Sequence, residues 1–222
     1  MIFLKMGNVI VGDVGGNRLK LTEFMVRRRT KISQMLGVVF LLVFIFSEKK
    51  LEGEAPFLAG IMFTTGCVLV GLATVGRLWC AQYIAGYKTD ALVTEGPYSI
   101  CRNPLYFFSF LGGTGAGLCT ESASLAVVII VAFVLIYPVT IRAEERKLRG
   151  IFGDAYEKYS AEVPRFIPNP SLFHEPSRYV IATKAYRREI VDALFFIWAV
   201  GLFELGEMLI ELRILPVLIS IY

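Results

Sequence analysis

The sequence predicts an all-α, polytopic membrane protein with about five transmembrane helices. Of its 222 residues, 55% are hydrophobic, and the mean hydropathy is +0.61, which is too apolar for an ordinary soluble domain of this size. The apolar runs are continuous rather than alternating, and only helices or closed barrels satisfy the backbone in lipid, so helices are expected. The net charge of +4 is carried beside apolar runs, where it indicates topology and anionic lipid headgroups rather than nucleic acid.

The first two spans are predicted at residues 32–46 and 56–79. The basic segment 27–31 precedes the first span and, by the positive-inside rule, places the N-terminus in the cytoplasm. Residues 48–54 carry mixed charges and suit an outer loop, after which Pro56 suits the first turn of a helix. Small residues recur along the second span every five or six positions, a pattern that favours close helix packing over ligand binding; they are Gly60, Gly66, Gly71 and Gly76.

A membrane hairpin is predicted over residues 104–141. The preceding residues 80–103 are more polar and are interpreted as an interfacial connector, and two apolar arms, 105–119 and 122–141, are joined by a turn at Thr120 and Glu121. Pro104 suits the first turn of the first arm, and Asn103 is a favourable N-cap. The glycine-rich run 112–117 lies inside this arm without a preceding strand, so helix packing is favoured over a nucleotide-binding loop.

The remaining chain is predicted as a charged cytoplasmic segment, 142–188, with one short helix near 143–152, followed by a fifth apolar span within 190–222. Glu204, Glu207 and Glu211 fall on one face of that span, which is costly against lipid. A polar face between helices is favoured over a direct catalytic role.

The cysteines and the single histidine are interpreted as residues without a catalytic role. The cysteines have no CxxC pairing and lie in or beside apolar segments, so they are predicted to be small buried side chains, and no metal site is expected; they are Cys67, Cys80, Cys101 and Cys119. His174 lies in a proline-rich loop and is predicted to be solvated.

Two polar clusters lie on either side of the hairpin and should meet at one membrane face. The N-terminus of the helix at Asn103 can receive an anion, and Glu144 or Glu145 can hold an ammonium group or ribose hydroxyls. Tyr98 and Tyr106 offer flat faces to a heteroaromatic ring or a sulfonium. These groups match S-adenosylmethionine, although interfacial anchoring and helix capping explain the same residues equally well.

The segment 92–106, followed by an apolar hairpin, by Glu144-Glu145 and by residues 152–159, resembles the isoprenylcysteine carboxyl methyltransferase and phospholipid methyltransferase superfamily over about residues 77–168. This resemblance implies a membrane enzyme that binds S-adenosylmethionine near the cytoplasmic surface and takes a lipophilic or prenylated acceptor from the bilayer. It further implies that Arg142 orients an acceptor carboxylate with support from Glu145. The cofactor site it implies is formed by Gly86, Asp90, Ala91, Leu92, Val93, Tyr98, Arg102, Asn103, Pro104, Leu105, Tyr106 and Glu144.

The resemblance divides the chain into three regions: an N-terminal region, 1–79, a catalytic core, 80–176, and a C-terminal extension, 177–222. Many relatives carry histidine at the position of Asn103, and asparagine cannot titrate near neutral pH, so no general base is expected there. Isoprenylcysteine-type carboxyl methylation is the leading hypothesis. The alternatives are N-methylation of a phospholipid amine, an NADPH-dependent reductase of the sterol reductase type, and a non-catalytic membrane protein. No oligomeric state is predicted.

Overall fold

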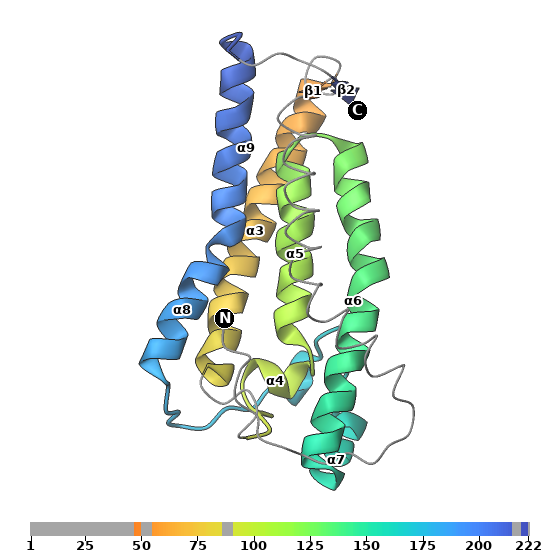
Figure 1. The fold of residues 1–222 in the computed structure, drawn as a ribbon, viewed down its shortest axis with the longest axis vertical. Coiled ribbons are helices and arrows are strands. Elements are labelled where there is room, and N and C mark those ends of the chain that lie inside the picture. Colours follow the sequence, from red (N-terminus) through yellow and green to blue (C-terminus); the bar gives the residue numbers. More distant parts are fainter. Residues whose placement is uncertain (1–46, 50–54, 86–90, 215–218, 222) are drawn as a thin grey trace, which may run out of the picture. The chain divides into compact units, whose positions relative to one another are not determined.

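The computed structural model describes residues 47–49, 55–85, 91–214 and 219–221, and its helices confirm the predicted all-α class (Figure 1). Two three-residue strands, β1 (Ser47–Lys49) and β2 (Ile219–Ile221), pair in parallel. The predicted first span, 32–46, lies outside the described residues. The helices in chain order are α3 (Pro56–Ile84), α4 (Pro97–Ile100), α5 (Pro104–Cys119), α6 (Ala123–Phe152), α7 (Asp154–Glu162), the 3-10 turn η1 (Pro170–Leu172), α8 (Thr183–Ala193) and α9 (Phe195–Glu211).

Three helical segments of the described chain are long and apolar enough to cross a membrane: Pro56–Ile84, Ala123–Phe152 and Thr183–Ile210. Helix α5 has 16 residues, about 24 Å at 1.5 Å per residue, and is shorter than these segments. It lies between α3 and α6 and also contacts α9 (Figure 1). The first arm of the predicted hairpin is therefore a short helix packed against longer ones.

Several predicted helix boundaries were wrong. Helix α3 continues to Ile84, so the first residues of the predicted connector are helical. Helix α6 runs unbroken for 30 residues from Ala123 to Phe152, and the separate short helix predicted near 143–152 is its last part. The last helical segment begins at Thr183, before the predicted apolar span, and is divided at Leu194 into the charged helix α8 and the apolar helix α9.

The contact between α3 and α5 depends on glycines. A Cβ atom added to Gly66 would lie 2.6 Å from the carbonyl oxygen of Gly115 and 2.7 Å from Sγ of Cys119, so the two helices approach more closely than a side chain would permit. Gly76 faces the ring of Phe108 in the same way. The prediction of close packing is confirmed at these positions.

Two other glycines of α3 do not take part in this packing. No atom of the described residues lies within 4 Å of a Cβ added to Gly60 or Gly71, so a packing role for these two glycines stays a prediction. The glycine-rich run of α5 is a packing surface as predicted, because Gly112 faces Phe196 of α9, Gly115 faces Gly66, and Gly117 faces Ala126 of α6.

Replacing Gly66 by valine is expected to destabilise the protein by about 1–3 kcal/mol, the usual cost of overpacking. The matched control is Gly71→Val on the same helix, where no atom of the described part of the chain lies within 4 Å of the added Cβ. Thermal unfolding in detergent should show a lower midpoint for Gly66→Val than for Gly71→Val. Equal midpoints for the two variants would contradict the packing of α3 against α5.

Three of the four cysteines, Cys80, Cys101 and Cys119, are buried as predicted, whereas Cys67 is exposed. Its Sγ nevertheless lies 3.9 Å from that of Cys119, so Cys67 lies at the edge of the contact between α3 and α5. Helix α9 contains all three glutamates of the predicted acidic face; Glu204 is exposed and Glu207 is partly buried. The role of that face stays a prediction.

Candidate functional site

A tight turn between residues 96 and 104 positions one half of the site. Gly96 adopts φ +58°, a left-handed conformation that favours glycine, and a side chain there would meet the ring of Tyr83. The short helix α4 follows, and Pro104 then begins α5. The turn places Arg102 and Asn103 directly before the second helix.

The segment after α7 is fastened to this turn by main-chain hydrogen bonds. The amide of Arg102 donates to the carbonyl of Pro164 at 2.9 Å, and the amide of Asn169 donates to the carbonyl of Ile100 at 2.8 Å. Nearby, the Tyr159 hydroxyl donates to the carbonyl of Tyr98 at 2.7 Å. These hydrogen bonds hold residues that are far apart in the sequence together around the turn.

Glu145 of α6 joins the two predicted clusters. Its side chain is buried, with 5% of the residue exposed, and its Oε1 accepts a hydrogen bond from Nδ2 of Asn103 at 3.2 Å. Nη1 of Arg102 lies 3.6 Å from the same oxygen, and Nε of Arg165 donates to Oε2 at 3.0 Å. The hairpin thus brings the turn before α5 to the end of α6, as the sequence predicted.

Asn103 occupies the predicted N-cap position of α5, but its side chain makes no capping hydrogen bond. Its Nδ2 instead donates to Glu145 and to the carbonyl oxygen of Arg165, at 3.0 Å in the second case. The prediction of the position was right and that of the side-chain role was wrong, because the buried carboxylate offers a charge-assisted partner.

Glu144, adjacent to Glu145, is exposed and faces different neighbours. Its Oε2 accepts a 2.7 Å hydrogen bond from the hydroxyl of Tyr106, and the ring of Tyr106 meets that of Tyr137 edge-on at 5.3 Å. One glutamate of the pair is therefore accessible to a ligand while the other is held inside.

Tyr98 lies in the core rather than on an open face. It is 6% exposed and packs with Cys80 and Tyr83, so its ring faces are covered. Its hydroxyl has no hydrogen-bond partner among the residues that the structure describes, and burial raises the pKa of this hydroxyl well above its usual value. The hydroxyl is therefore a neutral donor.

The thiol of Cys101 also bonds the turn to the segment after α7. It donates to the carbonyl of Phe166 at 3.1 Å, and burial raises its pKa to about 11. The thiol stays protonated at neutral pH and cannot serve as a nucleophile there.

The other residues that were predicted to bind the cofactor lie around this turn or outside the residues that the structure describes. Gly86 and Asp90 lie outside the described residues. Ala91 is exposed. Leu92 packs against the buried cluster of Tyr156, Tyr159 and Val163. Val93 and Leu105 pack against the buried cluster of Cys80, Tyr83 and Tyr98. Pro104 is buried at the start of α5. His174 is exposed, as predicted.

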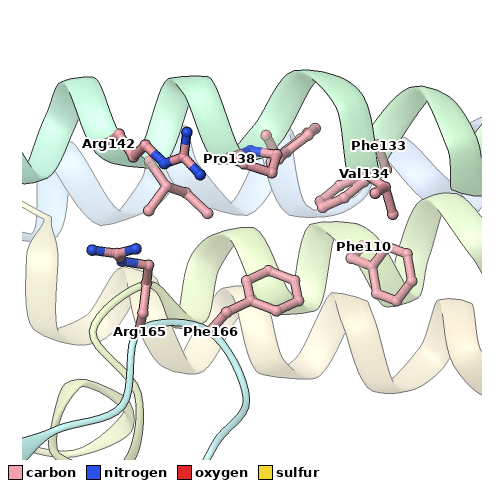
Figure 2. A pocket seen from close by; sticks show the side chains of 9 residues that line it. Phe110, Phe133, Val134, Pro138, Arg142, Arg165 and Phe166 are labelled. Atoms are coloured by element: carbon pink, nitrogen blue, oxygen red, sulfur yellow. The ribbon is translucent and has the colours of Figure 1, made fainter.

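A pocket of about 290 Å³ lies beside these clusters, between α5, α6 and the segment after α7 (Figure 2). Its two guanidinium groups lie at one end, and aromatic side chains lie toward the other. The sequence predicted a role for Arg142 but missed Arg165 and Phe166, whose signal was a basic and an aromatic residue between Pro164 and Pro168. The lining residues are Phe110, Phe133, Val134, Tyr137, Pro138, Ile141, Arg142, Arg165 and Phe166.

Known proteins match this chain at two levels. The sequence model of a family described as phospholipid methyltransferase matches residues 55–155. The nickel-cobalt-cadmium resistance protein NccN of Alcaligenes xylosoxydans xylosoxydans is 38% identical over 177 residues, which cover 80% of this chain and 82% of that protein. The cobalt-zinc-cadmium resistance protein CzcN of Cupriavidus metallidurans is 37% identical over 177 residues, 80% of this chain and 81% of that protein.

A third relative matches a shorter part of the chain. The protein-S-isoprenylcysteine O-methyltransferase of Schizosaccharomyces pombe is 31% identical over 81 residues, 36% of this chain and 34% of that enzyme. No solved structure matches the chain.

Proposed function

Because the chain belongs to the superfamily of phospholipid methyltransferases and isoprenylcysteine carboxyl methyltransferases, we propose that it is an S-adenosylmethionine-dependent methyltransferase of an amphiphilic acceptor. The observation that carries this proposal is the meeting of Glu144 and Glu145 with the turn before α5, beside a pocket with an apolar body and a cationic end. A carboxylate of the isoprenylcysteine type suits that cationic end best.

The residues around the turn fit such a cofactor. Glu144 is exposed and can accept hydrogen bonds from ribose hydroxyls or an ammonium group, with the Tyr106 hydroxyl fixing its orientation. The buried Tyr98 hydroxyl, which has no partner within the described chain, is a further donor. Arg102 and Asn103 pair with Glu145 and hold the shape of the site. The parts assigned to Gly86 and to residues 90–93 remain proposals.

The acceptor would be placed by residues of the pocket. Bound S-adenosylmethionine would supply a methyl group on a sulfonium sulfur, and methylation of a carboxylate oxygen releases no proton. Positioning and exclusion of water then supply the rate enhancement, which agrees with an asparagine at position 103. Arg142 at the pocket end would hold the acceptor's carboxylate.

N-methylation of a phospholipid amine is the second candidate, favoured by the description of the matching family. An ammonium acceptor would have to lie beside two guanidinium groups, which is electrostatically unfavourable. The two relatives that match over 177 residues are named for resistance to metal ions. The acceptor is therefore proposed as an anionic amphiphile in general, not as a prenylated protein alone. The cytoplasmic orientation stays a prediction of the positive-inside rule.

Calorimetric titration of the detergent-purified protein with S-adenosylhomocysteine and with NADPH tests the proposal. Binding of S-adenosylhomocysteine alone is expected, and labelled methyl groups from S-adenosylmethionine should then appear in a prenylcysteine acid rather than in phosphatidylethanolamine. A folded protein that binds no S-adenosylhomocysteine would refute the methyltransferase function. Label in phosphatidylethanolamine alone would establish the second candidate.

Glu144→Gln and Tyr106→Phe are expected to weaken S-adenosylhomocysteine binding by about tenfold or more, the value of a hydrogen bond to a charged group. The control is Glu157→Gln, since Glu157 is a half-exposed carboxylate that pairs with Arg149 outside the site. Its affinity for S-adenosylhomocysteine should equal that of the wild type. Unchanged binding in Glu144→Gln would exclude that carboxylate from the cofactor site.

A further inference from the structure

Two thiol groups meet where α3 packs against α5. The Sγ atom of Cys67 on α3 lies 3.9 Å from the Sγ atom of Cys119, which is the last residue of α5. The thiol of Cys119 also lies 3.8 Å from the carbonyl oxygen of Phe63, one helical turn before Cys67. The sulfur of Cys119 is therefore seated against α3 between these two residues, although 52 positions separate the cysteines in the sequence.

The backbones of the two helices are close enough here for a disulfide. A Cβ atom added to Gly66, the residue before Cys67, would lie 2.8 Å from the backbone nitrogen of Cys119, so no side chain separates the helices at this level. A disulfide needs Cα atoms about 4.4–6.8 Å apart and a sulfur–sulfur bond of about 2.05 Å. From 3.9 Å, rotation about the two Cα–Cβ bonds can bring the sulfur atoms together without a shift of either helix.

The two thiols differ in accessibility. Cys67 is exposed, whereas the residue Cys119 is 0% exposed. Thiol–disulfide exchange needs one thiolate that the reagent can reach and a second thiol that attacks the mixed disulfide. Cys80 and Cys101 are buried, so Cys67 is the exposed thiol among the four cysteines of the chain. The pair therefore has an attacking thiol and a shielded resolving thiol in contact with it.

The pair lies at the opposite end of α5 from the candidate site. Asn103 directly precedes the first residue of α5, and Cys119 is the last, followed by the polar turn at Thr120 and Glu121. The predicted topology places this turn at the outer face of the membrane, and disulfides persist in the oxidising compartments that such faces border. A role for this pair is therefore independent of the proposed methyltransferase function.

We propose that Cys67 and Cys119 are a redox-active thiol pair that disulfides of small thiols, RSSR, convert into a cross-link between α3 and α5. The Cys67 thiolate attacks one sulfur of RSSR, whose sulfur–sulfur bond breaks and releases the first RS⁻. The Cys119 thiolate then attacks Sγ of Cys67 in the mixed disulfide and releases the second RS⁻. Two protein thiols are oxidised to one disulfide, RSSR is reduced to two RSH, and the two thiol protons end on RSH.

Oxidation of the reduced, detergent-purified full-length protein with bis(2-hydroxyethyl) disulfide, a small uncharged probe, tests this pair. Two of the four thiols should be lost, and mass spectrometry of a digest should find the Cys67 peptide joined to the Cys119 peptide. Dithiothreitol should restore both thiols. The unfolding midpoint of the oxidised protein should be higher than that of the reduced protein, because the cross-link constrains the unfolded chain.

Single substitutions separate the roles of the two thiols. Cys119→Ser or Cys119→Ala should accumulate one 2-mercaptoethanol adduct on Cys67, whereas Cys67→Ser should leave Cys119 unmodified. The control Cys80→Ala should still form the cross-link, since Cys80 is a buried residue outside the pair. A folded wild type that keeps all four thiols, that retains the adduct on Cys67 without the cross-link, or that joins Cys67 to Cys67 of a second copy would overturn the proposal.

Discussion

Replacing Glu145 by alanine is expected to destabilise the protein by about 3–5 kcal/mol, the cost of breaking a buried ion pair by removing one partner. Glu145 is 5% exposed and holds Arg102, Asn103 and Arg165. The Arg102 side chain is only 11% exposed, so its charge would remain buried without compensation. Thermal unfolding in detergent should show a large fall in the midpoint.

The neighbouring residue provides the matched control. Glu144→Ala removes an exposed carboxylate whose described partner is the Tyr106 hydroxyl, and such a surface interaction contributes about 1 kcal/mol or less. Glu144→Ala should therefore lower the affinity for the cofactor while the stability stays nearly unchanged. Glu145→Ala should instead lower the stability of the fold. Similar midpoints for the two variants would contradict the positioning role proposed for Glu145.

This difference between two adjacent glutamates could not be predicted from the sequence. Both were predicted at the end of the hairpin, and both are there. Which one points inward depends on the rotation of α6 about its axis, which is fixed by its packing against α5 and by the segment carrying Arg165. The residues near Glu144 in the sequence do not predict that rotation.

Asn103 and Arg165 show the same limit on prediction. Pro104 after Asn103 marks a helix start, so the N-cap position was predictable, but the side-chain partner is a carboxylate 42 residues further along the chain. Arg165 lies in a proline-containing segment without helical or strand periodicity, so its distance from the site could not be inferred. Its role follows from main-chain hydrogen bonds to the turn before α5.

Helix ends were predictable where glycine or proline marks them. Helices α3 and α5 begin at Pro56 and Pro104, as predicted. Residues 143–149 are charged, but alanine, glutamate, arginine, lysine and leucine are strong helix formers, so α6 continues until Gly153 adopts φ +50°. At Leu194 neither glycine nor proline marks the break between α8 and α9, and it was missed.

Arg142→Ala is expected to lower the turnover of a carboxylate acceptor by about 100-fold, the scale of a loss of positioning, with unchanged affinity for S-adenosylhomocysteine. Arg142 lines the pocket proposed for the acceptor, and its guanidinium group lies at the same end as that of Arg165 (Figure 2). Initial rates with labelled S-adenosylmethionine and a prenylcysteine acid, together with calorimetric titration of S-adenosylhomocysteine, measure the two quantities separately.

The control for this variant is Arg146→Ala, one helical turn further along α6. Arg146 is exposed, and its Nε donates to the carbonyl oxygen of Arg142 at 3.3 Å, so its removal takes away the same charge without opening the pocket. Turnover should then stay close to that of the wild type. Equal losses in both variants would indicate a general electrostatic effect on the anionic acceptor, and a parallel loss of S-adenosylhomocysteine affinity in Arg142→Ala would place this arginine in the cofactor site instead.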